Sequence, residues 1–264
     1  MNADIFIPAR LDSTRLPKKQ LKIINGVPII KILIDRLRNA KKIRDIIVCT
    51  TTSKTDDELV LYLEKINVKY FRGSKKDILK RLLNAAEKFD TDIIINVEGD
   101  KIYTDPDFVD ELVKNLEIPK IDFVMGQANE FDPAESIHGI IPSGFKVSAL
   151  NKICQLKETN DTETGYIEFF TNTNYFNCKY IFPKIKIDIP KNLKLTLDYP
   201  EDLEFAEKIF NILGNNPKFE EIITLISKNP ELIKIIELTS EKWNANYRKN
   251  ITKISLNLKN DNGD

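Results

Sequence analysis

The chain has 264 residues, of which 42% are hydrophobic and 30% are charged, enough for one large α/β domain. Its 40 Lys and Arg residues balance its 40 Asp and Glu residues, so no global basic field exists to attract nucleic acid. The three cysteines are far apart, no signal peptide is visible, and no apolar run reaches the ~20 residues that a transmembrane helix needs. We therefore expect a cytoplasmic protein with no zinc site, disulfide framework or membrane span.

The first half of the chain alternates between predicted strands and helices. Continuous apolar runs predict strands, and apolar residues at helical spacing predict helices. The predicted strands cover 4–8, 44–51, 68–74 and 92–100. The predicted helices cover 28–40, 54–68, 77–89 and 105–116, with Thr55 as the expected cap of the second. This alternation predicts a Rossmann-like α/β fold, in which a mostly parallel sheet carries helices on both faces.

The alternation weakens after residue 121. A strand leading into a helix is expected in "GFKVSALNKI", a short helix at 164–172, and a further strand at 193–197 followed by a helix to about 210. We predict one domain over residues 1–210 and a C-terminal helical appendage over 211–264, with a polar tail from about Thr239. We assign no chemistry to this appendage. Trp243 and Tyr247 are expected to dock it onto the core or onto a second subunit.

Polar side chains follow the predicted strands at their carboxyl ends, where ligands bind in open parallel sheets. Cations and hydroxyls follow the first three strands, and carboxylates follow the fourth and the late one. The set is Arg10, Arg15, Lys19, Thr50, Thr51, Thr52, Ser53, Arg72, Gly73, Ser74, Glu98, Asp100 and Asp198. Guanidinium and ammonium groups suit phosphate oxygens, and carboxylates suit a divalent metal. The rim therefore predicts a site for a polyphosphate with a metal ion, and the alternative is a solvated basic loop.

The loop after the first strand has neither a Walker A motif nor a dinucleotide fingerprint, so side chains would have to hold the phosphates. Its sequence, "IPARLDSTRLPKKQL", resembles the signature loop of the cytidylyltransferases that activate sugar acids, such as CMP-KDO synthetase and the spore-coat polysaccharide group. Three later stretches resemble the same family in the same order: "RGSKKDILKRLLNAAEKF", "NVEGD", similar to Asn-Val-Gln-Gly-Asp, and "LTLDYPEDLEFA", similar to Leu-Thr-Val-Asp-x-Pro-Glu-Asp-Leu. The resemblance covers about residues 4–210.

The resemblance implies a fold of the nucleotide-diphospho-sugar transferase type and a Mg²⁺-dependent transfer of CMP from CTP to an acidic sugar or related acid, for surface-glycan synthesis. Pyrophosphate would leave, and the protein would be a homodimer. Arg15, Lys19 and Asp100 would be catalytic, and Asp100 and Asp198 would bind Mg²⁺. The other residues that would bind the nucleotide are Ala9, Arg10, Ser13, Thr51, Thr52, Arg72, Gly73 and Ser74.

The middle segment, residues 121–191, is expected to hold the acceptor pocket. Its candidate side chains, together with Lys101, are His138, Ser143, Lys146, Glu163, Tyr166 and Glu168. The alternative is that this segment is a dimer surface with ordinary salt bridges, because polar surface of this kind is common. An isolated histidine such as His138 is more often structural than catalytic.

Besides Glu in place of Gln in "NVEGD", this chain departs from the family pattern at three places. Lys18 stands where the family usually has Gly, and Lys101–Ile102 follow the "GD" that the family often continues with Glu-Pro or Cys-Pro. "GSKKD" replaces the Ser-Gly-Thr-x-Arg stretch of the KDO enzymes, which favours the spore-coat group. Three alternatives stay open: another nucleotide or acceptor on the same fold, a glycosyltransferase, and a non-catalytic nucleotide-binding member. A glycosyltransferase usually has an Asp-x-Asp pair, and here only Asp100 is present.

Overall fold

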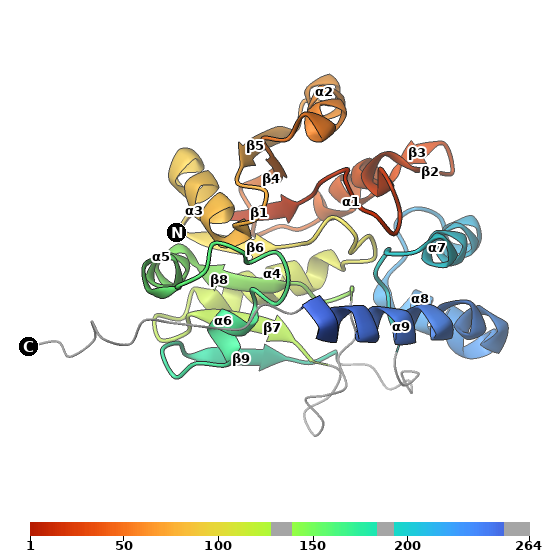
Figure 1. Cartoon of the computed structure of the whole chain (residues 1–264). Helices are drawn as coiled ribbons and strands as arrows, with labels where there is room; N and C mark the ends of the chain where they lie inside the picture. Colours follow the sequence, from red (N-terminus) through yellow and green to blue (C-terminus); the bar gives the residue numbers. More distant parts are fainter. Residues whose placement is uncertain (128–138, 184–192, 251–264) are drawn as a thin grey trace, which may run out of the picture.

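The computed structural model describes residues 1–127, 139–183 and 193–250, and its centre is a seven-stranded sheet (Figure 1). Across the sheet, the strands are β5 (Lys69–Gly73), β4 (Asp45–Thr51), β1 (Ala3–Pro8), β6 (Ile93–Asn96), β8 (Ser143–Lys146), β7 (Phe123–Gly126) and β9 (Cys178–Ile181). The first four run parallel, β8 is antiparallel to both its neighbours, and β7 and β9 are parallel. The predicted mostly parallel α/β sheet is confirmed.

The central strands separate two hydrophobic cores, one on each face of the sheet. Side chains alternate between the faces of a strand, so in β1 Ile5 and Ile7 belong to one core and Phe6 belongs to the other. In β6 the same alternation places Ile93 and Ile95 opposite Ile94. Strands buried on both faces in this way are continuous apolar runs in the sequence, which is why they could be predicted.

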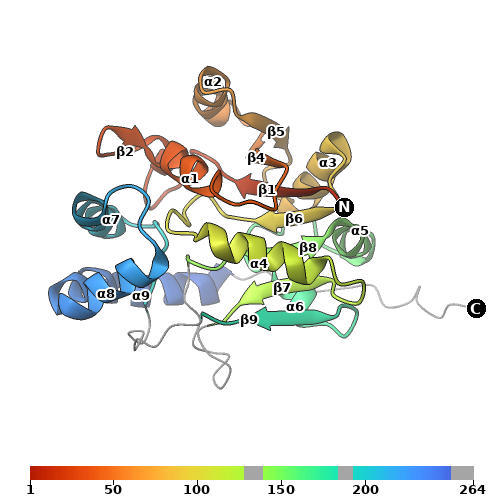
Figure 2. The same ribbon diagram turned by 180° about the vertical axis from the view of Figure 1, so that it is seen from behind.

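Helices cover both faces of the sheet, as Figures 1 and 2 show from opposite sides. The first core packs against α1 (Ile29–Leu37), α2 (Asp57–Lys65), α4 (Pro106–Leu116), α7 (Pro200–Leu213), α8 (Phe219–Lys228) and α9 (Pro230–Asn250). The second packs against α3 (Ile78–Phe89), α5 (Val147–Leu156) and α6 (Glu168–Thr171). A small hairpin of β2 (Ile23–Ile24) and β3 (Val27–Pro28) turns at Asn25 and Gly26, which both have positive φ, as a tight hairpin turn requires.

The C-terminal helices pack into the same core as the first strand. Phe205 of α7, Ile222 and Ile226 of α8 and Leu232 of α9 all belong to it. The prediction of a polar tail from Thr239 is wrong, because α9 continues to Asn250. Thr239 itself is fully buried, and its hydroxyl donates to Asp202, so a polar residue marks a contact here rather than the end of structure.

Other predicted boundaries also need correction. Residues 193–197 lie outside the seven-stranded sheet, with only Lys194 in an isolated bridge, and the strand expected at 92–100 ends at Asn96. Ser53, rather than Thr55, accepts the capping hydrogen bond at the short 3₁₀ helix η2 (Lys54–Asp56) that precedes α2. The short helix expected at 164–172 is α6 alone.

Candidate active site

The loop that follows β1 is fixed at both ends, so its cations have defined positions. The backbone N–H of Leu11 donates to Asp56, and that of Lys18 donates to the Leu11 carbonyl at 3.0 Å. The side chains of Leu11 and Leu16 are buried. Lys18 has φ 53°, in the left-handed region that favours glycine, which explains physically why a glycine is usual at this position. The short 3₁₀ helix η1 (Lys19–Leu21) follows directly.

Two cations of this loop meet two carboxylates from distant parts of the chain. Arg15 Nη2 lies 2.8 Å from Asp198 Oδ1, and Lys19 Nζ lies 2.7 Å from Asp100 Oδ2 and 3.6 Å from Asp198 Oδ1. Lys19 also donates to the carbonyl of Leu197 at 3.1 Å. The Leu197 N–H in turn donates to the Asp100 carbonyl, which holds the two aspartate loops side by side. Arg15, Lys19, Asp100 and Asp198 therefore form one cluster, as predicted.

Burial and charge act in opposite directions in this cluster. Burial alone would lower the pKa of Lys19, but Asp100 and Asp198 raise it, so the ammonium stays charged. Burial alone would raise the pKa of Asp198, but Lys19, Lys194 and Arg15 lower it. The pKa of Asp100 is raised, by burial first and then by the neighbouring Asp198 and Glu98. The two carboxylates thus compete for one ammonium group, and Asp198 is the more firmly ionised.

Asp202 orients Asp198 from the start of α7. Its Oδ2 accepts hydrogen bonds from the backbone N–H groups of Asp198 at 2.8 Å and Tyr199 at 2.9 Å, and from Lys194 Nζ at 2.6 Å. Asp202 is the third residue of the helix, where a carboxylate that accepts from the N-cap N–H is favoured. The Asp-x-Pro-Glu-Asp stretch therefore serves as a helix start that presents Asp198 to the cluster.

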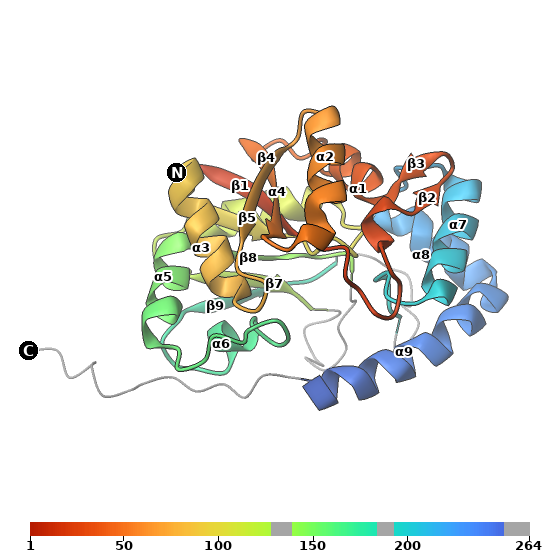
Figure 3. The ribbon, with the colours of Figure 1, turned by 45° about the horizontal axis from the view of Figure 1, so that its top comes forward.

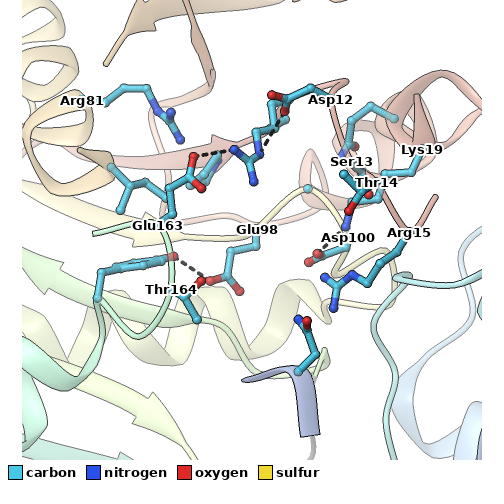
Figure 4. Close-up of a pocket in the computed structure, with 18 of the residues that line it drawn as sticks. Asp12, Ser13, Thr14, Arg15, Lys19, Arg81, Glu98, Asp100, Glu163 and Thr164 are labelled. Carbon is cyan, nitrogen blue, oxygen red and sulfur yellow. Dashed lines mark hydrogen bonds and ion pairs between the residues drawn. The ribbon is translucent and has the colours of Figure 1, made fainter. Parts of the chain in front are cut away.

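A cavity of about 760 Å³ opens beside the cluster (Figure 4). One wall is the loop after β1, and the opposite wall is the segment 159–166. The residues that line it are Pro8, Ala9, Arg10, Asp12, Ser13, Thr14, Arg15, Lys19, Gln20, Ile78, Arg81, Glu98, Gly99, Asp100, Thr159, Asp161, Glu163, Thr164, Tyr166 and Asn246. Its volume lies within the usual range for small-molecule sites. The predicted residues Ala9, Arg10, Ser13, Glu163 and Tyr166 all face it.

Arg10 connects the two walls of the cavity. Its Nη1 lies 2.5 Å from Glu163 Oε1, and its Nε lies 3.2 Å from Asp12 Oδ1. Asp12 also forms an ion pair with Lys75. Burial alone would raise the pKa of Asp12, but Lys75 and Arg10 lower it, so this carboxyl is ionised. The ion pairs of Arg10 therefore hold the first loop and the 159–166 segment together, and Figure 4 shows Asp12 and Glu163, which belong to these two segments.

Glu98 lines the cavity together with Asp100 and Tyr166, and Figure 4 shows it beside Asp100. Its Oε1 accepts from the Tyr166 hydroxyl at 2.7 Å, and its Oε2 lies 2.6 Å from Lys101 Nζ. Asn96 Nδ2 donates to the same Tyr166 hydroxyl at 2.8 Å. Burial alone would raise the pKa of Glu98, but Lys101 and the Tyr166 hydrogen bond lower it, so the carboxylate is charged. Lys101 thus neutralises Glu98 instead of facing the cavity.

Comparison with known proteins decides the family. The model of the family described as "Cytidylyltransferase" matches residues 5–221. The chain belongs to the cytidylyltransferase family. Its predicted class, a CTP-dependent nucleotidyltransferase, is thereby confirmed. In the part of the chain that the structure describes, no helix is both long and apolar enough for a membrane span.

Relatives and a solved structure agree with this family. The spore coat polysaccharide biosynthesis protein SpsF of Bacillus subtilis is 28% identical over 240 residues, which are 85% of this chain and 94% of that protein. The 8-amino-3,8-dideoxy-manno-octulosonate cytidylyltransferase of Shewanella pealeana is 31% identical over 135 residues, which are 51% of this chain and 52% of that protein. The structure of a cytidylyltransferase from Leptospira borgpetersenii serovar Hardjo-bovis superposes with a TM-score of 0.78 at 27% identity, covering 88% and 97% of the two chains.

The residues expected after the second and third strands lie outside the cavity. Thr51 is buried, and its hydroxyl bonds to Asp56, while Thr52 is exposed. Arg72 donates to the carbonyls of Thr51 at 2.9 Å and Ser53 at 2.8 Å, so it fastens the ends of β4 and β5 together.

Gly73 and Ser74 contact Arg81, a residue of the cavity that sequence reasoning missed. The Ser74 carbonyl accepts a hydrogen bond from Arg81 Nη1 at 2.8 Å. A Cβ added to Gly73 would lie 2.7 Å from the Arg81 side chain, so the two residues are tightly packed. Arg81 is 4% exposed and lines the cavity, and its Nε has no hydrogen-bond partner among the described residues. Burial lowers its pKa. In the sequence it reads as a surface cation of an amphipathic helix, so no local signal marks it.

The structure does not bring Lys146 or Glu168 to the cavity. Lys146 donates to the carbonyls of Ile118 and Pro119 at 3.0 and 2.8 Å, beyond the end of α4. Glu168 accepts from the Tyr247 hydroxyl at 3.0 Å. Ser143 is buried at the start of β8, next to Asn96. His138 lies outside the described residues.

Proposed function

We propose that this cytidylyltransferase transfers CMP from CTP to an acidic sugar or related acid, with Mg²⁺, releases pyrophosphate and serves surface-glycan synthesis. The observation that carries the proposal is that Arg15 and Lys19 meet Asp198 and Asp100 beside a cavity large enough for a nucleotide and a sugar. The names of the two relatives, a spore coat polysaccharide biosynthesis protein and an octulosonate cytidylyltransferase, support a glycan pathway and a sugar-acid acceptor. The cytoplasmic location and the homodimer implied by the resemblance stay predictions.

The carboxylates fit Mg²⁺ in the way that nucleotide-dependent enzymes hold it. Asp100 and Asp198 already share one cation, because the Lys19 ammonium lies 2.7 and 3.6 Å from their oxygens. Within the described ranges no group of three or more His, Cys, Asp or Glu residues is arranged as a metal site. Mg²⁺ commonly needs only one or two carboxylates, because substrate phosphates and water complete its coordination. Asp100 and Asp198 would therefore hold the ion together with the triphosphate.

The chemistry required of the protein is mainly positioning and charge neutralisation. An oxygen of the acceptor hydroxyl attacks the α-phosphorus of CTP. The bond between the α-phosphorus and the oxygen that bridges it to the β-phosphate breaks, and pyrophosphate leaves. Arg15 and Lys19 would bind the phosphate oxygens on which negative charge collects. When bound, Mg²⁺ would add positive charge there and lower the pKa of the acceptor hydroxyl. The rigid loop after β1 holds its cations in place before the substrate arrives, which favours this reaction.

The two walls of the cavity suggest how the substrates divide between them. The wall formed by the first loop supplies Arg10, Arg15 and Lys19 for the triphosphate, with Arg81 as a further buried guanidinium. The wall at 159–166 supplies hydroxyl and carboxylate groups from Thr164, Glu163 and Tyr166, which suit the hydroxyls of a sugar. We therefore assign the 159–166 wall to the acceptor.

A pyrophosphate-release assay tests the proposal. The full-length protein is incubated with Mg²⁺ and either CTP, UTP or GTP, against a panel of sugar acids and other acidic metabolites. We expect release with CTP and at least one sugar acid, and loss of release when EDTA removes the metal. Turnover with UTP or GTP but not CTP would overturn the nucleotide assignment. Tight CTP binding with no release for any acceptor would instead indicate a non-catalytic member.

A further inference from the structure

The C-terminal helix α9 is tied to the loop that carries Asp198. The Thr239 hydroxyl donates to Asp202 Oδ1 at 2.8 Å, and both side chains are buried. The other oxygen of Asp202 accepts from the backbone N–H of Asp198. One carboxylate therefore joins the middle of α9 to the residue that we assign to the metal. Lys242, one turn further along, lies 3.3 Å from Glu201 of α7 and supports the same attachment.

The last turns of α9 are tied to the acceptor side of the cavity. The Tyr247 hydroxyl donates to Glu168 Oε1 at 3.0 Å, and Glu168 begins α6, two residues after the cavity-lining Tyr166. The Tyr247 ring stacks on Trp243, with ring centroids 5.1 Å apart and an interplanar angle of 14°. The helix therefore spans from the Asp198 loop to α6, along one side of the molecule (Figure 3).

Asn246 lies between these two attachments and lines the cavity. Residues 239, 243, 246 and 247 share one face of the helix, because 243, 246 and 247 follow 239 by about one or two turns. An amide has donors and an acceptor but no charge, so it suits the hydroxyl groups of a sugar better than a triphosphate, which needs cations. Its neighbour Tyr247 contacts the element that directly follows the acceptor wall. These facts place Asn246 at the acceptor end.

We propose that α9 forms an outer wall of the acceptor pocket and that Asn246 binds the acceptor through its side-chain amide. Thr239 and Tyr247 are positioning residues, which hold the helix against Asp202 and Glu168. The inference rests on the proposed function and extends it to a segment in which the sequence shows no chemistry. It also makes the acceptor site depend on a helix that starts about 30 residues beyond the Asp198 loop.

Steady-state kinetics of Asn246→Ala and Asn244→Ala test the inference, with the sugar acid of the panel that gives the fastest pyrophosphate release. Asn244 is exposed on the same helix but on another face, so it is a matched control. We expect Asn246→Ala to raise the KM for the acceptor about tenfold, the effect of losing one good hydrogen bond, with the KM for CTP and the Tm unchanged. Asn244→Ala should behave like the wild type. Equal effects of the two substitutions, or a change confined to the KM for CTP, would overturn the inference.

Tyr247→Phe tests the positioning role. It keeps the ring that stacks on Trp243 and removes only the hydroxyl that donates to Glu168. We expect a smaller rise in the same acceptor KM with kcat unchanged. A fall in kcat with no change in that KM would argue against a role at the acceptor.

A binding measurement separates failure of this inference from failure of the proposed function. Trp243 is the single tryptophan of the chain and stacks on Tyr247, so its fluorescence reports on this part of α9. We expect emission to change when the protein with CTP is titrated with the panel sugar acids, and the midpoint to move about tenfold in Asn246→Ala. If the wild type releases no pyrophosphate but this titration behaves as expected, only the proposed reaction fails. If pyrophosphate is released while emission and the acceptor KM ignore Asn246, only the α9 assignment fails. If the wild type releases no pyrophosphate and its emission does not change with any sugar acid, both the proposed function and the α9 assignment fail.

Discussion

Arg15 and Asp198 are 183 positions apart in the chain, yet Arg15 Nη2 and Asp198 Oδ1 lie 2.8 Å apart. The contact joins the loop after β1 to the start of α7. Lys19 adds a second link from the same loop to Asp100. The candidate active site is therefore assembled from three segments that are far apart in the sequence and that the fold brings together.

Replacing Arg15 with Ala should reduce catalysis much more than stability. Without Arg15, Asp198 keeps its ion pairs with Lys19 and Lys194, so its charge stays compensated, whereas one positioned cation of the phosphate site disappears. We expect kcat/KM to fall by about 10²–10³, the scale for losing one preorganised charge donor. The pyrophosphate-release assay measures this, with thermal unfolding alongside.

Lys18→Ala is the matched control for Arg15→Ala. Lys18 belongs to the same loop, but its ammonium pairs with Glu58 in solvent, and both side chains are more than half exposed. Such pairs contribute little to stability. Activity should stay close to that of the wild type. Comparable losses in Lys18→Ala and Arg15→Ala would mean that the loop acts only through its general positive charge.

Lys19→Met should destabilise the protein in a pH-dependent way. The substitution leaves Asp100 and Asp198 without their shared buried cation, and we expect a cost of about 3–5 kcal/mol at pH 7. The pKa of Lys19 is raised in the folded state despite its burial, because Asp100 and Asp198 favour the charged form. The stabilisation is therefore complete below the unfolded-state pKa of about 10.4 and is lost as the pH rises through the higher folded-state pKa.

Urea unfolding of the wild type and Lys19→Met at a series of pH values from 7 to 12 measures this difference. The gap in unfolding free energy should stay constant from pH 7 to about 10 and narrow only above it. A gap that instead widens as the pH rises from 7 to 9 would mean that the folded-state pKa of Lys19 is lowered rather than raised.

Glu98 and Lys101 should behave as a coupled pair. Glu98 stands where the family pattern has Gln, and Lys101 follows the "GD" where an acid or cysteine is common, so the two departures compensate each other in charge. Their side chains are 29% and 18% exposed and lie 2.6 Å apart. Lys101→Met should destabilise the protein, because Glu98 then keeps its charge with only the Tyr166 hydrogen bond. Adding Glu98→Gln should restore much of the loss.

A double-mutant cycle by urea unfolding measures this coupling. We expect about 0.5–3 kcal/mol between the two sites, the usual range for residues in direct contact. The Lys31–Asp35 pair on the surface of α1 is a control, for which the coupling should be about 0.3–0.5 kcal/mol. Additive effects at Glu98 and Lys101 would show that the two departures from the family pattern are independent.

The parallel half of the sheet could be predicted because its signals are local. Each strand is an apolar run, and the cations of the first loop come directly after the first of them. The antiparallel half could not be ordered in this way, since the pairing of β8 between β6 and β7 depends on contacts far apart in the sequence. Arg81 and Thr239 were missed for a related reason: each is a polar residue on a helix whose burial depends on what packs against it. Arg72 was predicted to belong to the site but lies outside the cavity, because neighbouring backbone carbonyls already bind its guanidinium.

Gly139→Ala should disrupt the segment that leads to Asp198. Gly139 has φ +105°, which L side chains rarely adopt, and a Cβ there would lie 1.8 Å from the Leu195 carbonyl oxygen. The backbone at residues 195–196 would have to move, and Asp198 follows it by two residues. We expect loss of both stability and activity, measured by urea unfolding and pyrophosphate release. Gly214→Ala is the matched control: it also has a glycine-type backbone conformation, with φ +77°, but nothing lies within 4 Å of the new Cβ, so it should cost about 1–3 kcal/mol and keep activity. Equal effects at both glycines would show that backbone conformation alone, rather than the contact with Leu195, makes Gly139 necessary.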